Sequence, residues 1–190
     1  MHYKVNTVWQ WQPSVRALLQ TVMLVLQTER LSLRHFEAED LEALFALYRD
    51  PDIRRYFPDG TRTLAETKEE LEWHRQGHPR HPELGLWAAV ERSSGKLLGR
   101  CGLLPWTIDG VAEVELAFLI DKTRWGEGFA TEAALALCRY AHERLQRQRL
   151  ICLVMHGNTA SVRVAEKVGM AYERDYSDEF GPCMIYARAI

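Results

Sequence analysis

Several features that mark whole classes of protein are absent from this sequence of 190 residues, or nearly so. No uninterrupted apolar run approaches the roughly 20 residues that a membrane-spanning helix needs, so we expect no membrane partner. The formal net charge is only −2, with 24 lysines and arginines against 26 aspartates and glutamates. Because a basic excess draws proteins to phosphate backbones, we do not expect nucleic acid as a partner either.

Cysteine is scarce, and the chain contains no C-x-x-C pair. The four cysteines each lie in an apolar stretch: Cys101, Cys138, Cys152 and Cys183. Such a setting favours buried, reduced thiols that pack as small hydrophobic side chains. A reducing compartment follows from reduced thiols, so we predict a cytoplasmic protein.

The first 22 residues differ from the rest of the chain. They contain Trp9 and Trp11 and carry few charges. Met23 follows them and stands directly before a segment that looks like the natural start of a domain. We therefore interpret residues 1–22 as an N-terminal extension, with a short helix over 14–21, and residues 23–190 as the functional domain. That length suits one domain with a continuous core.

Hydrophobic periodicity predicts an α+β domain, with mixed helices and strands around a single sheet. Strands are expected at 31–36, 86–91, 96–104, 112–120, 150–155, 170–175 and 183–189. One helix is expected to carry Leu41 and Tyr48 and to end before Asp50, and a second to carry Leu64 and Trp73 and to be ended by Gly77. Two further helices are expected at 128–146 and 159–168. Thr63 and Glu66 form a capping box before the second helix, and Gly169 suits the closing position of the last.

The sharpest local feature is R-W-G-E-G-F-A over 124–130, between a predicted strand and a predicted helix. Gly126 and Gly128 allow a tight turn and a close approach of the backbone to a ligand. The unpaired N–H groups and positive end of the following helix suit a pyrophosphate. Thr131 replaces the third glycine of a dinucleotide fingerprint, and no G-K-[ST] follows, so neither nucleotide motif applies. From these residues alone, an ordinary strand–helix connection is equally compatible.

A second motif, N-T-A-S-V-R-V-A-E-K-V-G-M over 158–170, follows the next strand, and L-Q-T-E-R-L-S-L-R over 26–34 opens the domain. With W-G-E-G-F-A-T-E-A, these three stretches resemble the GNAT N-acetyltransferase superfamily, most closely its Rim-type branch, which includes ribosomal-protein N-terminal acetyltransferases. The resemblance covers about 26–189. It implies the GNAT fold: one central, mostly antiparallel, splayed sheet of about six to seven strands, flanked by about four helices.

The resemblance also implies acetyl-CoA as cosubstrate and assigns residues to it. The strand backbone would pair with the pantetheine arm, the turn would hold the pyrophosphate, Asn158 would bond the arm, and Ser161 would lie near the thioester sulfur. The implied cofactor-binding residues are Phe118, Leu119, Ile120, Arg124, Trp125, Gly126, Glu127, Gly128, Phe129, Ala130, Thr131, Asn158 and Ser161. On the residues alone, Asn158 is also a helix N-cap and Ser161 a solvated helical serine.

An amine must lose a proton before it attacks a thioester, and a carboxylate can take that proton. Glu113 and Glu115 share one strand face because side chains repeat every two residues. The resemblance places Glu115 where the branch has a glutamate, so our hypothesis is that Glu115 is the general base. A structural or substrate-orienting role is the alternative. Ser161 or a water would protonate the leaving thiolate, because Ala165 stands where many relatives have a tyrosine.

Glu127 is a second departure from the family's pattern, since lysine or arginine is common at that position in the family. The positive potential for a pyrophosphate must then come from Arg124, Arg163 or Lys167. Arg163 and Lys167 are four residues apart and share a helix face. They suit the 3′-phosphate of the cofactor, although a solvated surface pair is the commoner meaning of such a spacing.

The acceptor remains open between a protein N-terminus and a small-molecule amine such as an antibiotic, polyamine or amino acid. Asp52, Asp59 and Glu113 would favour a cationic acceptor. Aromatic residues that line an acceptor pocket or pack in the core are Tyr56, Phe57 and Trp106, with Pro58 beside them. A non-catalytic acyl-CoA sensor is the alternative function. A homodimer is common in the family.

Three histidines, His74, His78 and His81, are four and three residues apart. Histidines four apart on one helix can share a metal. Gly77, Pro79 and Pro82 break the helix between these, so we predict no metal site.

Overall fold

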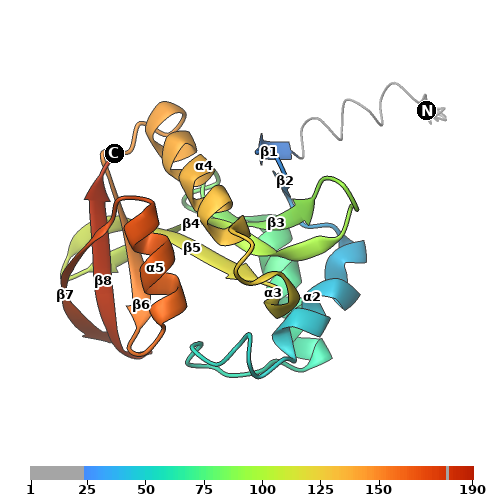
Figure 1. Ribbon diagram of the computed structural model, residues 1–190. Coiled ribbons are helices and arrows are strands. Elements are labelled where there is room, and N and C mark those ends of the chain that lie inside the picture. The colour runs from blue at the N-terminus through green and yellow to red at the C-terminus, as the bar shows by residue number, and fades with distance from the viewer. Residues whose placement is uncertain (1–23, 179) are drawn as a thin grey trace, which may run out of the picture.

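The computed structural model describes residues 24–178 and 180–190 (Figure 1). The extension at 1–22 and its expected helix therefore lie outside the described residues. The strands are β1 (Leu24–Gln27), β2 (Leu31–Arg34), β3 (Gly85–Glu91), β4 (Leu97–Ile108), β5 (Val111–Ile120), β6 (Arg149–Met155), β7 (Ala171–Asp178) and β8 (Gly181–Ala189). The helices are α2 (Leu41–Tyr48), α3 (Leu64–Gln76), α4 (Phe129–Glu143) and α5 (Thr159–Lys167), with 3-10 turns η1 (Ala38–Asp40) and η2 (Lys122–Arg124).

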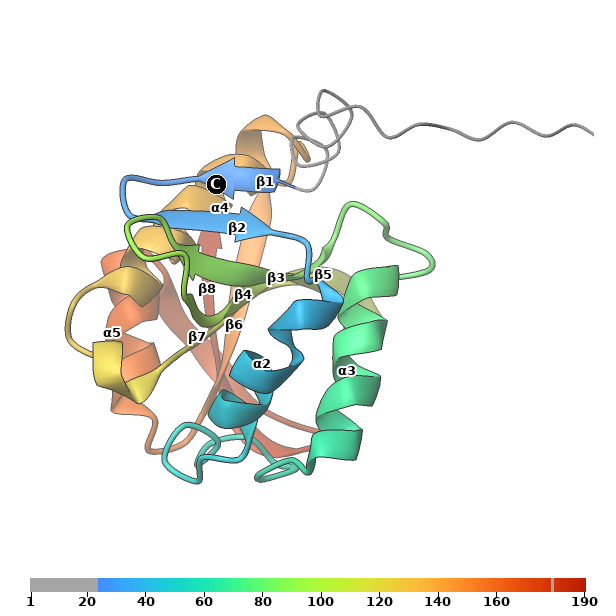
Figure 2. The ribbon, with the colours of Figure 1, turned by 90° about the vertical axis from the view of Figure 1, so that its right-hand side faces the viewer.

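Within residues 24–178 and 180–190, one mixed sheet of eight strands runs in the order β1-β2-β3-β4-β5-β6-β8-β7. Every neighbouring pair is antiparallel except β5 and β6, which are parallel. Helices α2 and α3 cover one face, and α4 and α5 cover the other (Figure 2). The predicted α+β class and the mostly antiparallel sheet are confirmed, with one strand more than expected.

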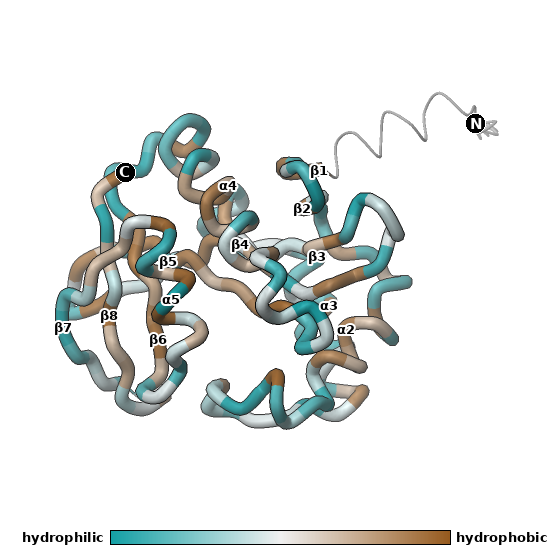
Figure 3. Tube along the Cα trace, viewed as in Figure 1, coloured by the Kyte–Doolittle hydropathy of each residue, from teal (hydrophilic) through white to brown (hydrophobic). Residues whose placement is uncertain are grey.

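The additional strand is β1, which pairs with β2 at the edge of the sheet. Its four residues are too few to show a clear alternation in the sequence, and only the neighbouring strand supplies its hydrogen bonds. At the other edge, β7 is largely exposed. Figure 3 shows apolar residues along the central strands and polar residues along β7.

Two apolar clusters hold the helices to the sheet. Ala133, Ala134 and Leu137 of α4 are fully buried against one face, because small side chains let the helix approach the strands. Leu44 of α2 and Leu71 of α3 pack on the other face. The capping box before α3 forms as expected: Thr63 accepts from the backbone of Glu66, whose carboxylate accepts from the backbone of Thr63.

Strand β4 extends to Ile108, beyond the end we expected at residue 104. Proline usually ends a central strand because it lacks an N–H. The last pair between β3 and β4 is Gly85 with Leu103, so Pro105 lies where β4 has only β5 beside it. The hairpin then closes through Asp109 and Gly110, both with positive φ (51° and 80°), as in a two-residue type I′ turn.

The sheet is splayed between its two parallel strands. Although β5 has 10 residues and β6 has 7, their ladder consists of Glu115 opposite Ile151. Past this pair the strands separate toward their carboxyl ends. The turn at 124–130 follows β5 and α5 follows β6, so parallel pairing places both at the same edge of the sheet. This opening is the feature of the fold that positions a site.

Among the described residues, none of the helices is both long and apolar enough to cross a membrane.

Candidate active site in the splayed sheet

The glycine turn leaves the start of α4 uncapped. Gly126 and Gly128 have positive φ angles of 83° and 86°, which favour glycine. Gly128 is the N-cap of α4 and offers no side chain to the first N–H groups of the helix. Apart from Gly126 and its two chain neighbours, no atom of the described residues lies within 4 Å of the point that a Cβ on Gly126 would occupy. The turn therefore presents free backbone donors and open space, as an anion requires.

Glu127 does not leave an uncompensated negative charge beside this turn. Its carboxylate accepts from Arg124, with Nε–Oε1 at 3.1 Å and Nη2–Oε2 at 3.0 Å. Arg124 also binds Glu91, with Nη2–Oε1 at 2.7 Å. Because two carboxylates share one guanidinium, Arg124 contributes little net positive potential to a ligand.

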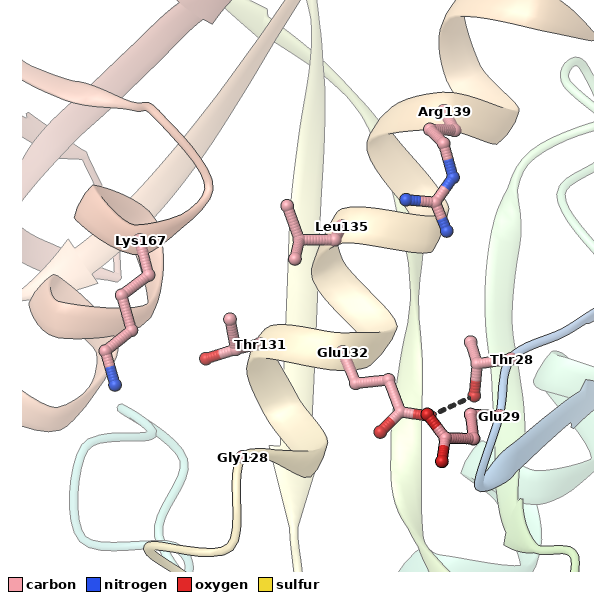
Figure 4. Close-up of a pocket in the computed structure, with 8 residues that line it drawn as sticks. All are labelled: Thr28, Glu29, Gly128, Thr131, Glu132, Leu135, Arg139 and Lys167. Atoms are coloured by element: carbon pink, nitrogen blue, oxygen red, sulfur yellow. Dashed lines mark hydrogen bonds between the residues drawn. The ribbon is translucent and has the colours of Figure 1, made fainter.

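A groove of about 460 Å³ begins at this turn. It is lined by Thr28, Glu29, Gly128, Thr131, Glu132, Leu135, Arg139 and Lys167. Figure 4 shows Lys167 of α5 and Thr131 of α4 on opposite sides of it. Of the three cations that the sequence suggested for phosphate binding, Lys167 lines this groove, whereas Arg163 is exposed and is not among the lining residues.

Glu132 ties the opening motif of the domain to the glycine turn. Its carboxylate accepts from Thr28 Oγ1 (2.5 Å) and from the backbone N–H (2.9 Å) and Nε (2.6 Å) of Arg30. Burial opposes its ionisation, but these donors outweigh it and lower the pKa of Glu132. Two of the three motifs therefore form one hydrogen-bonded unit at the start of α4. Sequence reasoning missed Glu132, although it stands inside W-G-E-G-F-A-T-E-A.

The residues assigned to the cofactor arm lie on both sides of the opening. Phe118, Leu119 and Ile120 belong to the part of β5 that has left β6. Trp125 donates from Nε1 to the carbonyl of Ile120 at 2.7 Å and so fixes the turn against the strand end. Asn158 caps α5: its Oδ1 accepts from the backbone N–H of Ser161 at 3.1 Å.

The N-cap interpretation of Asn158 is thus confirmed, and its contact with a cofactor remains a prediction. Ser161 lies half-buried in the first turn of α5, at the same edge of the sheet as the glycine turn.

Glu115 lies at the vertex of the opening. Its side chain is buried, and its Oε2 accepts from Trp106 Nε1 at 2.6 Å. Burial raises the pKa of Glu115 to about 7. Three contacts favour the ionised form and oppose this rise: the hydrogen bond from Trp106, the backbone N–H of Leu153 and the charge of Arg100. A carboxyl with a pKa near neutrality suits reversible proton transfer at physiological pH.

A second groove, of about 630 Å³, lies on the α3 side of the sheet. It is lined by Arg54, Phe57, Asp59, Arg62, Glu66, Glu69, Glu70, Trp73, His74, Leu86, Arg100, Leu104 and Phe180. Leu104 of β4, which lines the groove, is paired with Glu115 of β5. Paired residues on neighbouring strands point to the same face of the sheet. The groove therefore lies on the face of the sheet to which Glu115 belongs.

The aromatic residues suggested for an acceptor pocket have separate places. Phe57 lines this second groove. Tyr56 donates from its hydroxyl to the carbonyl of Gly157 at 2.8 Å, which joins the α2–α3 loop to the start of α5. Trp106 holds Glu115 and packs edge-on against Phe180 at 6.2 Å, and Pro58 is exposed.

The three acidic residues expected to favour a cation are all in ion pairs. Asp52 binds Lys122 at 2.8 Å, and Glu113 binds Arg149 at 3.1 Å. Asp59 lines the groove but binds both Arg54 and Arg62. Their charges are therefore compensated in part, because Asp50 shares Lys122 with Asp52 and Glu173 shares Arg149 with Glu113.

Sequence reasoning missed a buried polar cluster beneath the groove. Tyr48 donates to Glu70 at 2.8 Å, and the Nη2 atom of Arg100 lies 3.8 Å from the same carboxylate. Burial opposes ionisation of Glu70, but its contacts with His74, Arg100 and Tyr48 lower its pKa to about 2. The one signal in the sequence is Arg100 itself, a charge inside an otherwise apolar strand.

All four cysteines are buried and free, which confirms the prediction of unpaired thiols. His74 lies in α3, whereas His78 and His81 follow it with ring centroids 5.2 Å apart. No group of three potential metal ligands occurs in the part of the chain that the structure describes.

Residues 30–171 match the family model described as acetyltransferase (GNAT) domain. YkkB of Bacillus subtilis (strain 168), an uncharacterised protein, is 34% identical over 164 residues, which cover 86% of this chain and 94% of the relative. A GNAT-family acetyltransferase of Bacillus anthracis has the same fold, with a TM-score of 0.72 and 25% identity over 88% of this chain and 98% of the other.

RimL, a ribosomal alpha-N-protein acetyltransferase solved in complex with coenzyme A, has a TM-score of 0.70 and 16% identity over 88% of this chain and 98% of its own. The fold and the motifs define a domain of the splayed-sheet type. The chain belongs to the GNAT acetyltransferase family. The family predicted from the three motifs is thereby confirmed.

Proposed function

We propose that this protein is an N-acetyltransferase that transfers the acetyl group of acetyl-CoA directly to a primary amine, with Glu115 as general base. The observation that carries the proposal is the position of Glu115: buried, at the vertex of the opening between β5 and β6, and held by Trp106. A pKa of about 7 gives this carboxylate the basicity that the reaction needs.

Three features support acetyl-CoA as the donor. Among the described residues, the backbone of Phe118–Ile120 has no strand partner on the β6 side, so apart from the carbonyl of Ile120, which accepts from Trp125, it is free to pair with the amide groups of pantetheine. The uncapped start of α4 suits the pyrophosphate. Lys167 supplies a cation at the groove beside it. RimL, which shares the fold, was solved with coenzyme A.

The reaction balances with one base at the vertex. Glu115 takes a proton from the acceptor ammonium, and the neutral nitrogen attacks the thioester carbonyl. The new C–N bond forms, the C–S bond breaks, and the thiolate of coenzyme A leaves. A backbone N–H near Phe118 and Leu119 polarises the carbonyl as negative charge develops on its oxygen. The nitrogen loses its second proton once the C–N bond has formed, and this proton passes through Ser161 or a water to the thiolate, because Ala165 has no acidic hydrogen to give.

The test is release of free thiol from acetyl-CoA, followed across a panel of peptides and small amines. Turnover with at least one amine, together with saturable binding of acetyl-CoA, is the expected result. Saturable binding of acetyl-CoA without turnover of any amine would instead identify a non-catalytic acyl-CoA sensor. Failure to bind acetyl-CoA would contradict both functions.

A further inference from the structure

Arg100 is a buried guanidinium that lacks hydrogen bonds. Arg100 is 8% exposed, and its side chain donates a hydrogen bond to no acceptor among the described residues. The nearest carboxylate oxygen, Glu70 Oε1, is 3.8 Å from Nη2, too far for a hydrogen bond. A guanidinium has five donors, and leaving buried charged donors unpaired is costly.

Arg54, in the same groove, shows what a satisfied guanidinium looks like here. It is 2% exposed, donates from Nε to the carbonyl of Gly60 at 2.7 Å and binds Asp59 through Nη2. Both arginines lie over aromatic rings, Arg100 at 5.5 Å from the centroids of Tyr48 and Phe57. The difference between them is that Arg100 has no hydrogen-bond acceptor. The groove is therefore prepared for a hydrogen-bond-accepting group from outside the protein.

The charges in the inner part of the groove favour an anion as that group. Three guanidiniums, of Arg54, Arg62 and Arg100, meet two carboxylates, of Asp59 and Glu70. Asp59 binds two of the three arginines. Apart from Glu115 on the same face, one positive charge is therefore left over. Two further carboxylates, of Glu66 and Glu69, also line the groove but are exposed, where water and salt screen them.

Arg100 and Glu115 belong to one face of two adjoining strands. Arg100 is opposite Leu119 and Leu104 is opposite Glu115, and side chains two residues apart share a face. Each influences the ionisation of the other, which is a sign of proximity. Glu115 lies four residues along β5 from Leu119 and is not among the residues that line the groove, so an acceptor whose anionic group is held by Arg100 must extend along this face to bring its amine to Glu115.

Resting on the function proposed above, we propose that the acceptor is a small amino carboxylate of the α-amino-acid type, whose carboxylate binds Arg100 while its ammonium meets Glu115. The planar fork of a guanidinium matches a carboxylate with two parallel hydrogen bonds. The apolar side chains of Phe57, Leu104 and Phe180 line the same groove and suit an apolar side chain on the amino acid. Acetylation removes the ammonium charge and leaves an anionic N-acetyl product.

The experiment compares matched acceptors at saturating acetyl-CoA: free leucine, methionine and phenylalanine, each with its primary amide and its decarboxylated amine. The measurement is kcat/KM from thiol release. We expect at least one free amino acid to exceed its own amide and amine at least tenfold. The amide has the more easily deprotonated amine, so intrinsic reactivity opposes this result and a preference for the acid reports recognition.

Arg100→Lys keeps the positive charge near Glu70 but loses the fork. We expect it to lower the acid-to-amide ratio of kcat/KM at least tenfold, mainly through KM for the acid. Arg49→Lys, at the exposed end of α2, is the matched control and should keep the wild-type ratio. Circular dichroism and acetyl-CoA affinity report the folding of both variants. If Arg100→Lys does not fold, the wild-type series decides the matter alone.

The inference is overturned if amides or plain amines match the acids, if Arg100→Lys reduces acids and amides equally, or if no amino acid is accepted. Acetylation of peptides or carboxylate-free amines alone would leave the proposed N-acetyltransferase function standing. Absence of turnover with every amine, while acetyl-CoA still binds, would remove both.

Discussion

Trp106 and Glu115 are nine residues apart in the chain and meet across the β4–β5 hairpin, where the indole Nε1 donates to Oε2 at 2.6 Å. The hairpin turn at Asp109 and Gly110 sets the register that brings them together. The donor holds the carboxylate at the vertex of the splayed sheet and favours its charged form against burial. The contact therefore contributes to both the position and the basicity of the proposed base, together with burial and the backbone N–H of Leu153.

Glu115→Gln removes the base but keeps an oxygen that can accept from Trp106. We expect kcat to fall by about 10²- to 10⁴-fold, the usual contribution of a positioned general base. The dissociation constant of acetyl-CoA, measured by calorimetry, should change little because the turn and Lys167 are untouched. Glu113→Gln, on the same strand face but paired with Arg149, is the control and should keep kcat within about twofold. Equal losses in both variants would contradict the assignment.

The pH profile should respond to Trp106. The base must be deprotonated to act, so kcat/KM for the wild type should rise with pH through a midpoint near 7. Trp106→Phe removes a hydrogen bond to the charged form, worth about 1.5–3 kcal/mol, and so raises the pKa of Glu115 by about 1–2 units. The midpoint of kcat/KM should move up by that amount, with activity recovering at alkaline pH. A midpoint that stays in place would show that another group is titrating.

Stability should depend on pH through the same carboxyl. The pKa of Glu115 in the folded protein is about 7, above its ordinary value of 4.5, so the folded state binds this proton more tightly than the unfolded state. Its contribution is fully favourable below pH 4.5 and is lost as the pH rises through 7, a change on the order of 3 kcal/mol. Relative to wild type, Glu115→Gln should gain stability over this window in urea denaturation. A constant difference from pH 4.5 to 8 would argue against the raised pKa.

Lys167 should contribute to acetyl-CoA binding as a single exposed cation. Lys167→Gln is expected to raise the dissociation constant about fivefold at low salt, which corresponds to about 1 kcal/mol, and less at high salt. Lys68→Gln, exposed on α3 and outside the groove, should leave the affinity unchanged. The same affinity for the two variants at all salt concentrations would exclude Lys167 from the phosphate site.

Local chemistry was enough to predict much of the fold. The capping box at Thr63 and Glu66 and the glycine turn before α4 form as expected, because each depends on residues a few positions apart. The end of β4 was predicted wrongly because Pro105 is tolerated only where β3 has already ended. That condition concerns a neighbouring strand and cannot be seen in the local sequence.

For the site, the sequence by itself determined the turn from residue types and short spacings, and its three motifs carried the resemblance that gave the family and pointed to Glu115 as the proposed base. Only the tertiary structure decided which charges are available. It paired Arg124 with Glu91 and Glu127, tied Glu132 to Thr28 and Arg30, and left Arg100 buried without a side-chain hydrogen bond to any of the described residues. Charge compensation depends on partners from distant segments and on burial, and neither is determined by the order of residues along a strand or helix.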